Sequence, residues 1–231
     1  MRDIRTITLD LDETLWAIHP VIERAERNLH DWLRDNYPRI TERFSPDGIF
    51  ELRGQVVAEN PERSYDFTFL RRTVLGRLGV AAGYGDGLVD DAMAVFSAAR
   101  NDVEVFPEVR PTLTELGRRY RVIAVTNGNA DVNSIGISDL FHEVISASSA
   151  GAAKPNRKIF DIAVAAGGAG ADQTLHVGDH PEVDVAGARE AGLRTVWVNR
   201  NGQDWPEHLQ RPDGIVRDVS ELLALLGATA R

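Results

Sequence analysis

The sequence contains no cysteine, so disulfide bonds and thiolate chemistry are both excluded. It also lacks any apolar run that approaches the ~20 residues of a membrane-spanning helix. Basic residues are in deficit, because 26 Lys and Arg stand against 35 Asp and Glu and give a formal net charge of −9 at pH 7. This charge argues against general binding to nucleic acid or to membrane surfaces. We therefore expect a cytoplasmic protein with a small-molecule partner, and the sequence leaves its oligomeric state open.

The segment from residue 16 to residue 102 shows helical patterns and no convincing strand. Pro38 is expected to close the first helix, and Ser45 to act as the N-cap of the second. Gly79 fits the C-terminal cap of the third. The predicted helices cover residues 21–36, 45–57, 67–78 and 88–99. Together they form a helical insertion placed directly after the first strand of another domain.

Outside this insertion, strand and helix patterns alternate along the chain. The clearest strand signal is a nearly continuous apolar run at residues 121–126, as expected for a strand buried on both faces. The alternation predicts an α/β fold, a parallel sheet with helices on both faces. A core domain of residues 1–15 and 103–231 would then carry the insertion, residues 16–102. The predicted strands are residues 6–9, 121–126, 143–148, 174–178, 194–198 and 215–216, and the predicted core helices are residues 111–120, 156–166, 182–191 and 219–226.

Polar residues follow several of these strands at the point where each strand ends. Asp10 and Asp12 follow the first strand. Thr126 ends the second, and Asp179 follows a later one. Aspartate is disfavoured inside strands, and ligands bind at the carboxyl edge of an open α/β sheet. Because two acids one residue apart repel each other unless they share a proton or a cation, the stretch predicts a metal site.

If these strand ends converge, carboxylates and several kinds of hydrogen-bond donor meet at one site. Carboxylate oxygens with room for water suit Mg²⁺, which bridges to substrate phosphate. Hydroxyl, amide, ammonium and backbone N–H donors suit phosphate oxygens, and they are supplied here by Thr126, Asn127, Lys154 and Gly128. Such a set is typical of phosphoryl transfer, in which positioning and charge neutralisation dominate catalysis. The expected partner is a small phosphorylated metabolite.

Four motifs occur in a fixed order along the chain, and in this order they resemble the four motifs of the haloacid dehalogenase (HAD) superfamily. The resemblance covers the core domain, and the helical insertion stands where the family's C1-type cap does. It implies a Rossmann-like sheet with adjacent motif strands, aspartyl-phosphate catalysis and a Mg²⁺ cofactor. The motifs are Asp10-Leu11-Asp12-Glu13-Thr14, Thr126-Asn127-Gly128, Lys154-Pro155 and Gly178-Asp179 followed by Asp184.

The resemblance also implies a role for each acidic residue of the motifs. Asp10 is the nucleophile that attacks phosphorus. Asp12 protonates the leaving oxygen and then activates water. The metal ligands are the side chains of Asp10 and Asp179 and the backbone carbonyl of Asp12. Asp184 supports the metal-bound waters or Lys154 from behind.

The remaining motif residues are implied to bind the transferring phosphoryl group. Thr126, Asn127 and the backbone of Gly128 hold its oxygens, and Lys154 offsets the charge of the phosphate and the nucleophile. Trp16 and His19 follow the first motif, near the expected hinge to the cap, and are expected to pack or hinge rather than to contact substrate. His180 is expected to form a local turn.

Several alternatives remain open within and beyond the family. A 2-haloacid dehalogenase shares the nucleophile and the helical cap but needs neither a metal nor a second catalytic aspartate, so Asp12 and Asp179 argue against it. A phosphotransferase or mutase differs only in the acceptor. A non-catalytic binding protein on this fold is expected to lack the nucleophile or the lysine. Residues 126–130 and 175–179 resemble phosphatases of flavin-pathway compounds, including 5-amino-6-(5-phospho-D-ribitylamino)uracil and FMN.

Overall fold

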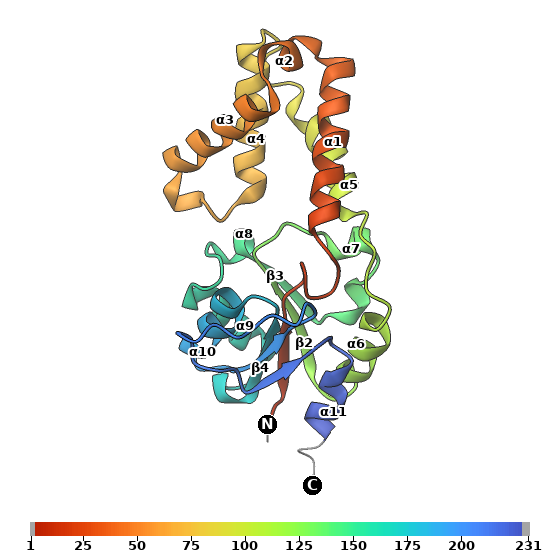
Figure 1. Ribbon diagram of the computed structural model, residues 1–231, viewed down its shortest axis with the longest axis vertical. Coiled ribbons are helices and arrows are strands. Elements are labelled where there is room, and N and C mark those ends of the chain that lie inside the picture. Colours follow the sequence, from red (N-terminus) through yellow and green to blue (C-terminus); the bar gives the residue numbers. More distant parts are fainter. Residues whose placement is uncertain (1–2, 228–231) are drawn as a thin grey trace. The chain divides into compact units, whose positions relative to one another are not determined.

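The computed structural model describes residues 3–227, which divide into two compact units (Figure 1). The sheet unit contains residues 3–17, 104–128 and 132–227. The helical unit contains residues 18–103 and 129–131. The assignment of the helical segment as a cap domain stays a prediction.

The sheet unit is built on β1 (Thr6–Leu9), β2 (Arg121–Thr126), β3 (Glu143–Ser146), β4 (Thr174–Gly178), β5 (Arg194–Val198) and β6 (Gly214–Val216). Within residues 3–227 these six strands are parallel and form one sheet in the order β3-β2-β1-β4-β5-β6. β1 lies at the centre, paired with β2 on one side and with β4 on the other. The predicted Rossmann-like α/β fold is confirmed, as is the prediction that the motif strands are adjacent.

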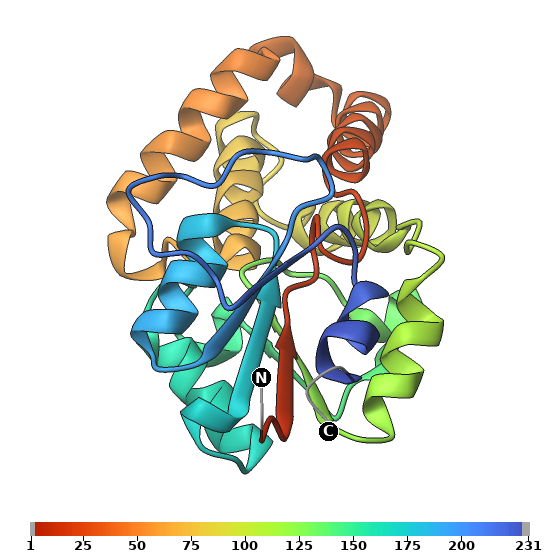
Figure 2. The same ribbon diagram turned by 60° about the horizontal axis from the view of Figure 1, so that its bottom comes forward.

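Helices cover both faces of this sheet, because each parallel crossover must return over one face or the other. The helices described in the sheet unit are α6 (Val109–Gly117), α7 (Val132–Ile135), α8 (Ala147–Ala150), α9 (Arg157–Gly167), α10 (Gly187–Glu190) and α11 (Glu221–Gly227). Figures 1 and 2 show α9 and α10 on one face, and α6 and α11 on the other. On the first face, Phe160, Ala163 and Ala188 share a buried core with Ile123 and Val125 of β2. The site-forming strands are thereby held from both sides.

The helical unit contains α1 (His19–Asn36), α2 (Pro38–Arg43), α3 (Pro46–Glu59), α4 (Phe67–Ala81) and α5 (Val89–Asn101). α1 buries Ala25, Leu29 and Leu33, the stripe that its apolar spacing predicts. The Ser45 hydroxyl accepts a hydrogen bond from the backbone N–H of Gly48 at 3.1 Å, which confirms Ser45 as the N-cap of α3. Among residues 3–227, no helix is both long enough and apolar enough to cross a membrane.

Of two helix-end predictions for the helical unit, one is confirmed and one is wrong. α1 ends at Asn36, just before Pro38, as predicted. Pro38 then begins α2, because proline suits the first position of a helix, where its missing N–H costs nothing. Gly79 lies inside α4 and does not cap it. A Cβ at Gly79 would stand 2.1 Å from the carbonyl oxygen of Gly85, so this glycine permits the close approach of the loop that follows α4.

Candidate active site

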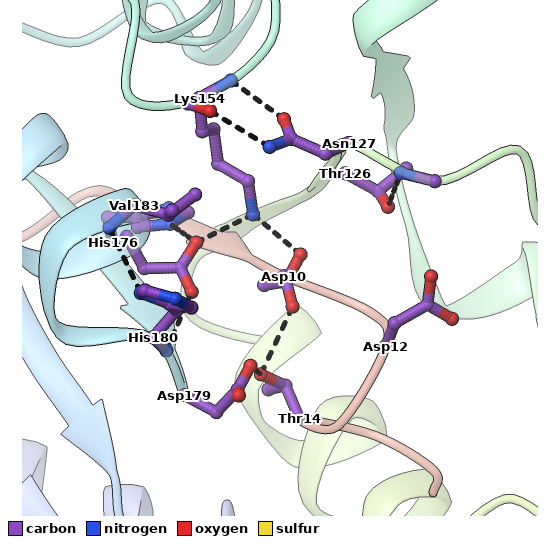
Figure 3. A network of polar contacts seen from close by, with 12 residues as sticks. Asp10, Asp12, Thr14, Thr126, Asn127, Lys154, His176, Asp179, His180 and Val183 are labelled. Carbon is purple, nitrogen blue, oxygen red and sulfur yellow. Dashed lines mark hydrogen bonds and ion pairs between the residues drawn. The ribbon is translucent and has the colours of Figure 1, made fainter. Parts of the chain in front are cut away.

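The carboxyl ends of β1, β2 and β4 bring the motif residues of the sheet unit to one edge (Figure 3). The backbone N–H of Asp10 donates to the carbonyl oxygen of Val177 at 2.9 Å, so Asp10 continues the pairing of β1 with β4 by one residue. The Asp10 side chain then projects from the end of the central strand, and only 7% of the residue is exposed. The predicted convergence of the strand ends is present.

Lys154 joins two of these carboxylates. Its ammonium lies 2.5 Å from Oδ1 of Asp10 and 2.6 Å from Oδ1 of Asp184. All three side chains are buried, so the ion pairs are screened little by water. Lys154 is therefore a fixed positive charge between the predicted nucleophile and the supporting aspartate, as expected for a residue that offsets negative charge.

Asn127 holds the loop that carries Lys154. Its side-chain Nδ2 donates to the carbonyl oxygen of Lys154 at 2.9 Å, and its Oδ1 accepts from the Lys154 backbone N–H at 2.7 Å. These bonds hold the Asn127 side chain against the lysine backbone and use its oxygen and one of its two side-chain N–H groups. Phosphate binding by Asn127 stays a prediction, and its backbone N–H is a further candidate donor.

Thr126 lies at the end of β2 with its hydroxyl at the rim of the site. Its Oγ1 accepts a hydrogen bond from the backbone N–H of Gly128 at 2.9 Å, and the residue is buried. This bond curls the chain after β2 into a tight turn, a common use of threonine. Figure 3 shows Thr126 and Asn127 on the side of Asp10 away from Asp179.

Asp179 completes an acidic cluster with Asp10 and Asp184, and one carboxylate oxygen of each residue lies within 4.8 Å of those of the other two. The hydroxyl of Thr14 stands within hydrogen-bond distance of both Asp10 Oδ2 (3.4 Å) and Asp179 Oδ1 (3.2 Å). Oxygen ligands of this kind at this spacing suit a hard divalent cation such as Mg²⁺. The donor chemistry of the site thus fits the metal that the sequence predicts.

The raised pKa values of Asp10 and Asp179 indicate an excess of negative charge in the site. Burial raises the pKa of Asp10 well above its ordinary value, and the charges of Asp184 and Asp179 raise it further, although Lys154 opposes them. Burial, aided by the charge of Asp184, raises the pKa of Asp179 to about 6. Three carboxylates stand against one ammonium, so a bound cation would relieve a real electrostatic cost.

Asp184 differs from the other two aspartates because its oxygens are already bound by the protein. Burial acts to raise its pKa, but Lys154 and His176 outweigh burial and hold the pKa below its ordinary value. Its Oδ2 also accepts the backbone N–H of His180 at 3.0 Å. Asp184 packs so closely on β4 that a Cβ at Gly178 would stand 2.4 Å from its Cγ. This arrangement suits a residue that supports Lys154.

His176 lies in the middle of β4 and is not among the site residues predicted from the sequence. Its Nε2 is 3.2 Å from Asp184 Oδ1, and its Nδ1 is 2.8 Å from the hydroxyl of Thr8. Burial lowers the pKa of His176, which favours a neutral ring that donates to Asp184 and accepts from Thr8. The available signal was a histidine inside an otherwise apolar strand, since buried polar groups require partners.

Asp12 follows Asp10 by two residues, and its carboxylate is bound by Trp16. The indole Nε1–H of Trp16 donates to Asp12 Oδ1 at 2.8 Å, and Trp16 is fully buried. Packing was the expected role for Trp16, but the hydrogen bond was not foreseen. His180 acts locally as expected, because its Nδ1 accepts the backbone N–H of Val183 at the start of the next helical turn.

The known proteins that match this chain include both phosphatases and dehalogenases. A family model for haloacid dehalogenase-like hydrolases matches residues 4–192. The chain is 30% identical over 214 residues to the 5-amino-6-(5-phospho-D-ribitylamino)uracil phosphatase YigB of Escherichia coli K12, a match that covers 89% of this chain and 90% of YigB. It is 28% identical over 239 residues to a glyceraldehyde 3-phosphate phosphatase of Methanopyrus kandleri, covering 95% of this chain and 98% of that protein. Among solved structures, a 2-haloacid dehalogenase from Pseudomonas syringae pv. Tomato DC3000 matches with a TM-score of 0.93 and 36% identity, covering 98% of this chain and 100% of that one.

Proposed function

The chain belongs to the haloacid dehalogenase-like hydrolase family, and on that premise we propose that it is a Mg²⁺-dependent phosphatase of small phosphomonoesters. One observation carries the proposal: the carboxylates of Asp10 and Asp179 lie together at the strand ends. Their negative charge exceeds what the single ammonium of Lys154 can offset. A carboxylate that only attacks carbon gains nothing from a second acid beside it. A site that binds a divalent cation together with a phosphate requires one.

In the first step, a carboxylate oxygen of Asp10 attacks the phosphorus atom of the substrate. A bond forms between this oxygen and phosphorus, the ester bond breaks, and Asp12 delivers its proton to the departing alkoxide oxygen. The hydroxyl of Thr126 and the backbone N–H of Asn127 are the donors for the phosphoryl oxygens, since the backbone N–H of Gly128 already donates to Thr126 Oγ1. The products of this step are the free alcohol and an Asp10 acyl phosphate.

In the second step, water hydrolyses the Asp10 acyl phosphate. Asp12, now a carboxylate, takes a proton from the water while the water oxygen attacks phosphorus. The bond between phosphorus and the Asp10 oxygen breaks, which releases inorganic phosphate and restores both aspartates. Throughout both steps Lys154 keeps a positive charge 2.5 Å from Asp10 Oδ1, which favours the anionic form of this nucleophile.

Mg²⁺ would be held by the side chains of Asp10 and Asp179, with the backbone carbonyl of Asp12 as a further ligand, and would supply charge neutralisation for the phosphoryl group. Asp184 is the less suitable ligand among the clustered carboxylates. Both of its oxygens already accept bonds from the protein, namely from Lys154, His176 and the backbone of His180.

For the substrate we propose a flavin-pathway phosphate, either 5-amino-6-(5-phospho-D-ribitylamino)uracil or FMN. The similarity to YigB along most of both chains supports this choice. The test is a panel of kcat/KM values for these compounds, for nucleoside monophosphates, for sugar phosphates and for phosphoglycolate. A large preference for phosphoglycolate or for nucleoside monophosphates would remove the flavin substrates from consideration.

A 2-haloacid dehalogenase is the second candidate, because the solved structure with a TM-score of 0.93 carries that name. The same nucleophile, Asp10, would then attack carbon and expel halide. The two functions separate cleanly by metal dependence. EDTA should silence the phosphatase and Mg²⁺ should restore it, whereas halide release from a 2-haloacid that resists EDTA would support the dehalogenase.

The covalent step is tested by Asp10→Asn, which is nearly isosteric but carries a poor nucleophile. We expect kcat to fall by at least about 10³-fold while the far-UV circular dichroism stays unchanged. Asp161→Asn on the exposed face of α9 is the matched control and should retain activity. Near wild-type turnover by the Asp10 variant would rule out catalysis through this residue.

A further inference from the structure

Trp16 is bound to the first motif through both its backbone and its side chain, the backbone to Glu13 and the side chain to Asp12. The carbonyl oxygen of Trp16 accepts the backbone N–H of Glu13 at 2.8 Å, and Leu15 N–H donates to Leu11 at 2.8 Å, so the segment after the first motif closes on itself. Glu13 has φ of +61°, a conformation that non-glycine residues adopt only where the surroundings impose it. The tight loop from Asp12 to Trp16 therefore has a defined shape.

The indole ring of Trp16 also contacts the carboxylate of Asp12, the group that would transfer the proton. Trp16 has no exposed surface, and its Nε1–H donates to Asp12 Oδ1 at 2.8 Å. A fully buried ring has little freedom to move, so the direction of its N–H is fixed. A hydrogen bond from a fixed donor selects one rotamer of Asp12 and fixes the plane of its carboxylate.

From this geometry we infer that Trp16 is a positioning residue for proton transfer by Asp12, an inference that rests on the proposed function. An indole N–H is a donor only and does not ionise in the range where enzymes work, so it orients the carboxylate without competing for its proton. General acid–base catalysis depends on this orientation, because the proton must travel along one line between Asp12 and the leaving oxygen or the water.

A purely structural role is the alternative reading, since a buried indole N–H needs an acceptor wherever it lies. The two readings differ in which reaction steps they affect. A positioning role acts only where Asp12 moves a proton. A structural role acts on stability and on every substrate alike. Leaving-group chemistry separates the two, because a phenolate leaves without protonation and an alkoxide does not.

The test compares Trp16→Phe with wild type on p-nitrophenyl phosphate and on glycerol 2-phosphate, both with Mg²⁺. For the aryl ester, kcat/KM should stay within about threefold, because phosphorylation of Asp10 then needs little acid assistance. For the alkyl ester, kcat/KM should fall by at least about tenfold. Hydrolysis of the acyl phosphate should also slow, giving a burst of p-nitrophenolate and an acid-stable phosphoprotein in quenched samples.

Two further variants control for folding and for the general loss of an indole. Trp205→Phe removes an indole N–H that donates to the carbonyl oxygen of Leu209 at 3.0 Å, and it should leave the ratio of the two kcat/KM values unchanged. If Trp16→Phe does not fold, β-(3-benzothienyl)alanine at position 16 keeps the shape of the ring and removes only the N–H. An equal loss on both esters, or no loss on either, overturns the positioning role.

The Asp12→Asn variant makes a failure of this inference distinguishable from a failure of the proposed function. In the Asp12→Asn background, Trp16→Phe should cause no further selective loss on the alkyl ester, because the group that it positions no longer transfers a proton. An additional selective loss in that background would overturn the inference. Full alkyl-ester activity of Asp12→Asn alone would overturn the proposed function itself.

Discussion

Asp179→Asn should make the metal-free protein more stable while it removes activity. Asp179 is partly buried, and this burial together with the nearby charge of Asp184 raises its pKa from 3.8 to about 6. An acid whose pKa is raised on folding adds stability at a pH below the unfolded value, and that contribution is lost as the pH rises through the folded value. Above pH 6, the ionised Asp179 therefore opposes folding in the absence of a cation.

The magnitude follows from the size of the shift. A shift of about two pKa units corresponds to at most about 3 kcal/mol, at about 1.4 kcal/mol per unit. Asp179 retains some contact with water and is coupled to its neighbours, so we discount this to about 1–2 kcal/mol. For a chain of this length, such a gain raises Tm by about 3–6 °C. The asparagine keeps the amide oxygen that accepts the Thr14 hydroxyl, so the local geometry should survive.

Thermal unfolding in EDTA at pH 7.5 and at pH 5.0 measures this effect. The variant should be the more stable protein at pH 7.5, and its advantage should shrink at pH 5.0, where the Asp179 carboxyl of the folded wild type is mostly protonated. Adding Mg²⁺ at pH 7.5 should raise the Tm of wild type by preferential binding to the folded state. The variant should gain much less from Mg²⁺, because it has lost a ligand.

The matched control for this experiment is Asp161→Asn, which changes an exposed aspartate paired with Arg157. Its stability should change by less than about 0.5 kcal/mol at either pH. An Asp179→Asn variant that is less stable than wild type in EDTA at pH 7.5 would refute the electrostatic argument. An advantage that is equal at both pH values would refute the assignment of the effect to ionisation.

Two further substitutions probe how Lys154 and Asp184 are held. Lys154→Met leaves the buried Asp10 and Asp184 carboxylates without their cation, so urea denaturation at pH 7.5 should show a loss of about 3–5 kcal/mol, and kcat should collapse; a stability equal to wild type would contradict the buried ion pairs. Gly178→Ala should displace Asp184, because the new Cβ would lie 2.4 Å from Asp184 Cγ, and should cost about 1–3 kcal/mol together with much of kcat/KM. Its control is Gly117→Ala, where a Cβ meets no atom within 4 Å, and equal behaviour of the two variants would contradict the crowding.

The sequence predicts the sheet well because its strands are buried on both faces. Such strands are continuous apolar runs with sharp polar ends, and the bounds predicted for β2, β4 and β5 match the structure. Helix ends are predicted less well, since tertiary contacts decide them. Glycine is the residue type expected at a helix C-terminus, but Gly79 lies inside α4. A glycine is needed there because the Gly85 carbonyl approaches too closely for a Cβ. That contact joins two segments and leaves no local pattern in the sequence.

For the candidate site, too, the sequence predicts some features and leaves others undetermined. The sequence identifies Asp10, Thr126 and Asp179 as residues that meet at the sheet edge, because each lies at or directly after a strand end and the topology brings those ends together. It does not predict which atoms each side chain binds. The Asn127 side chain forms hydrogen bonds to the backbone of Lys154, 27 residues further along the chain. His176 lies within hydrogen-bond distance of both Thr8 and Asp184. Such pairings exist only in the folded chain.

The hydrogen bonds around Asp184 determine where the excess charge of the site resides. Asp184 and Lys154 form a buried pair that His176 and the backbone of His180 also support, so this part of the cluster is internally balanced. The surplus negative charge then falls on Asp10 and Asp179, the two carboxylates whose pKa values burial and the nearby charge of Asp184 raise. A carboxylate destabilised in this way is relieved when a cation binds beside it. It is relieved again when its charge spreads onto phosphorus in the transition state, so one electrostatic arrangement supports both metal binding and nucleophilic attack.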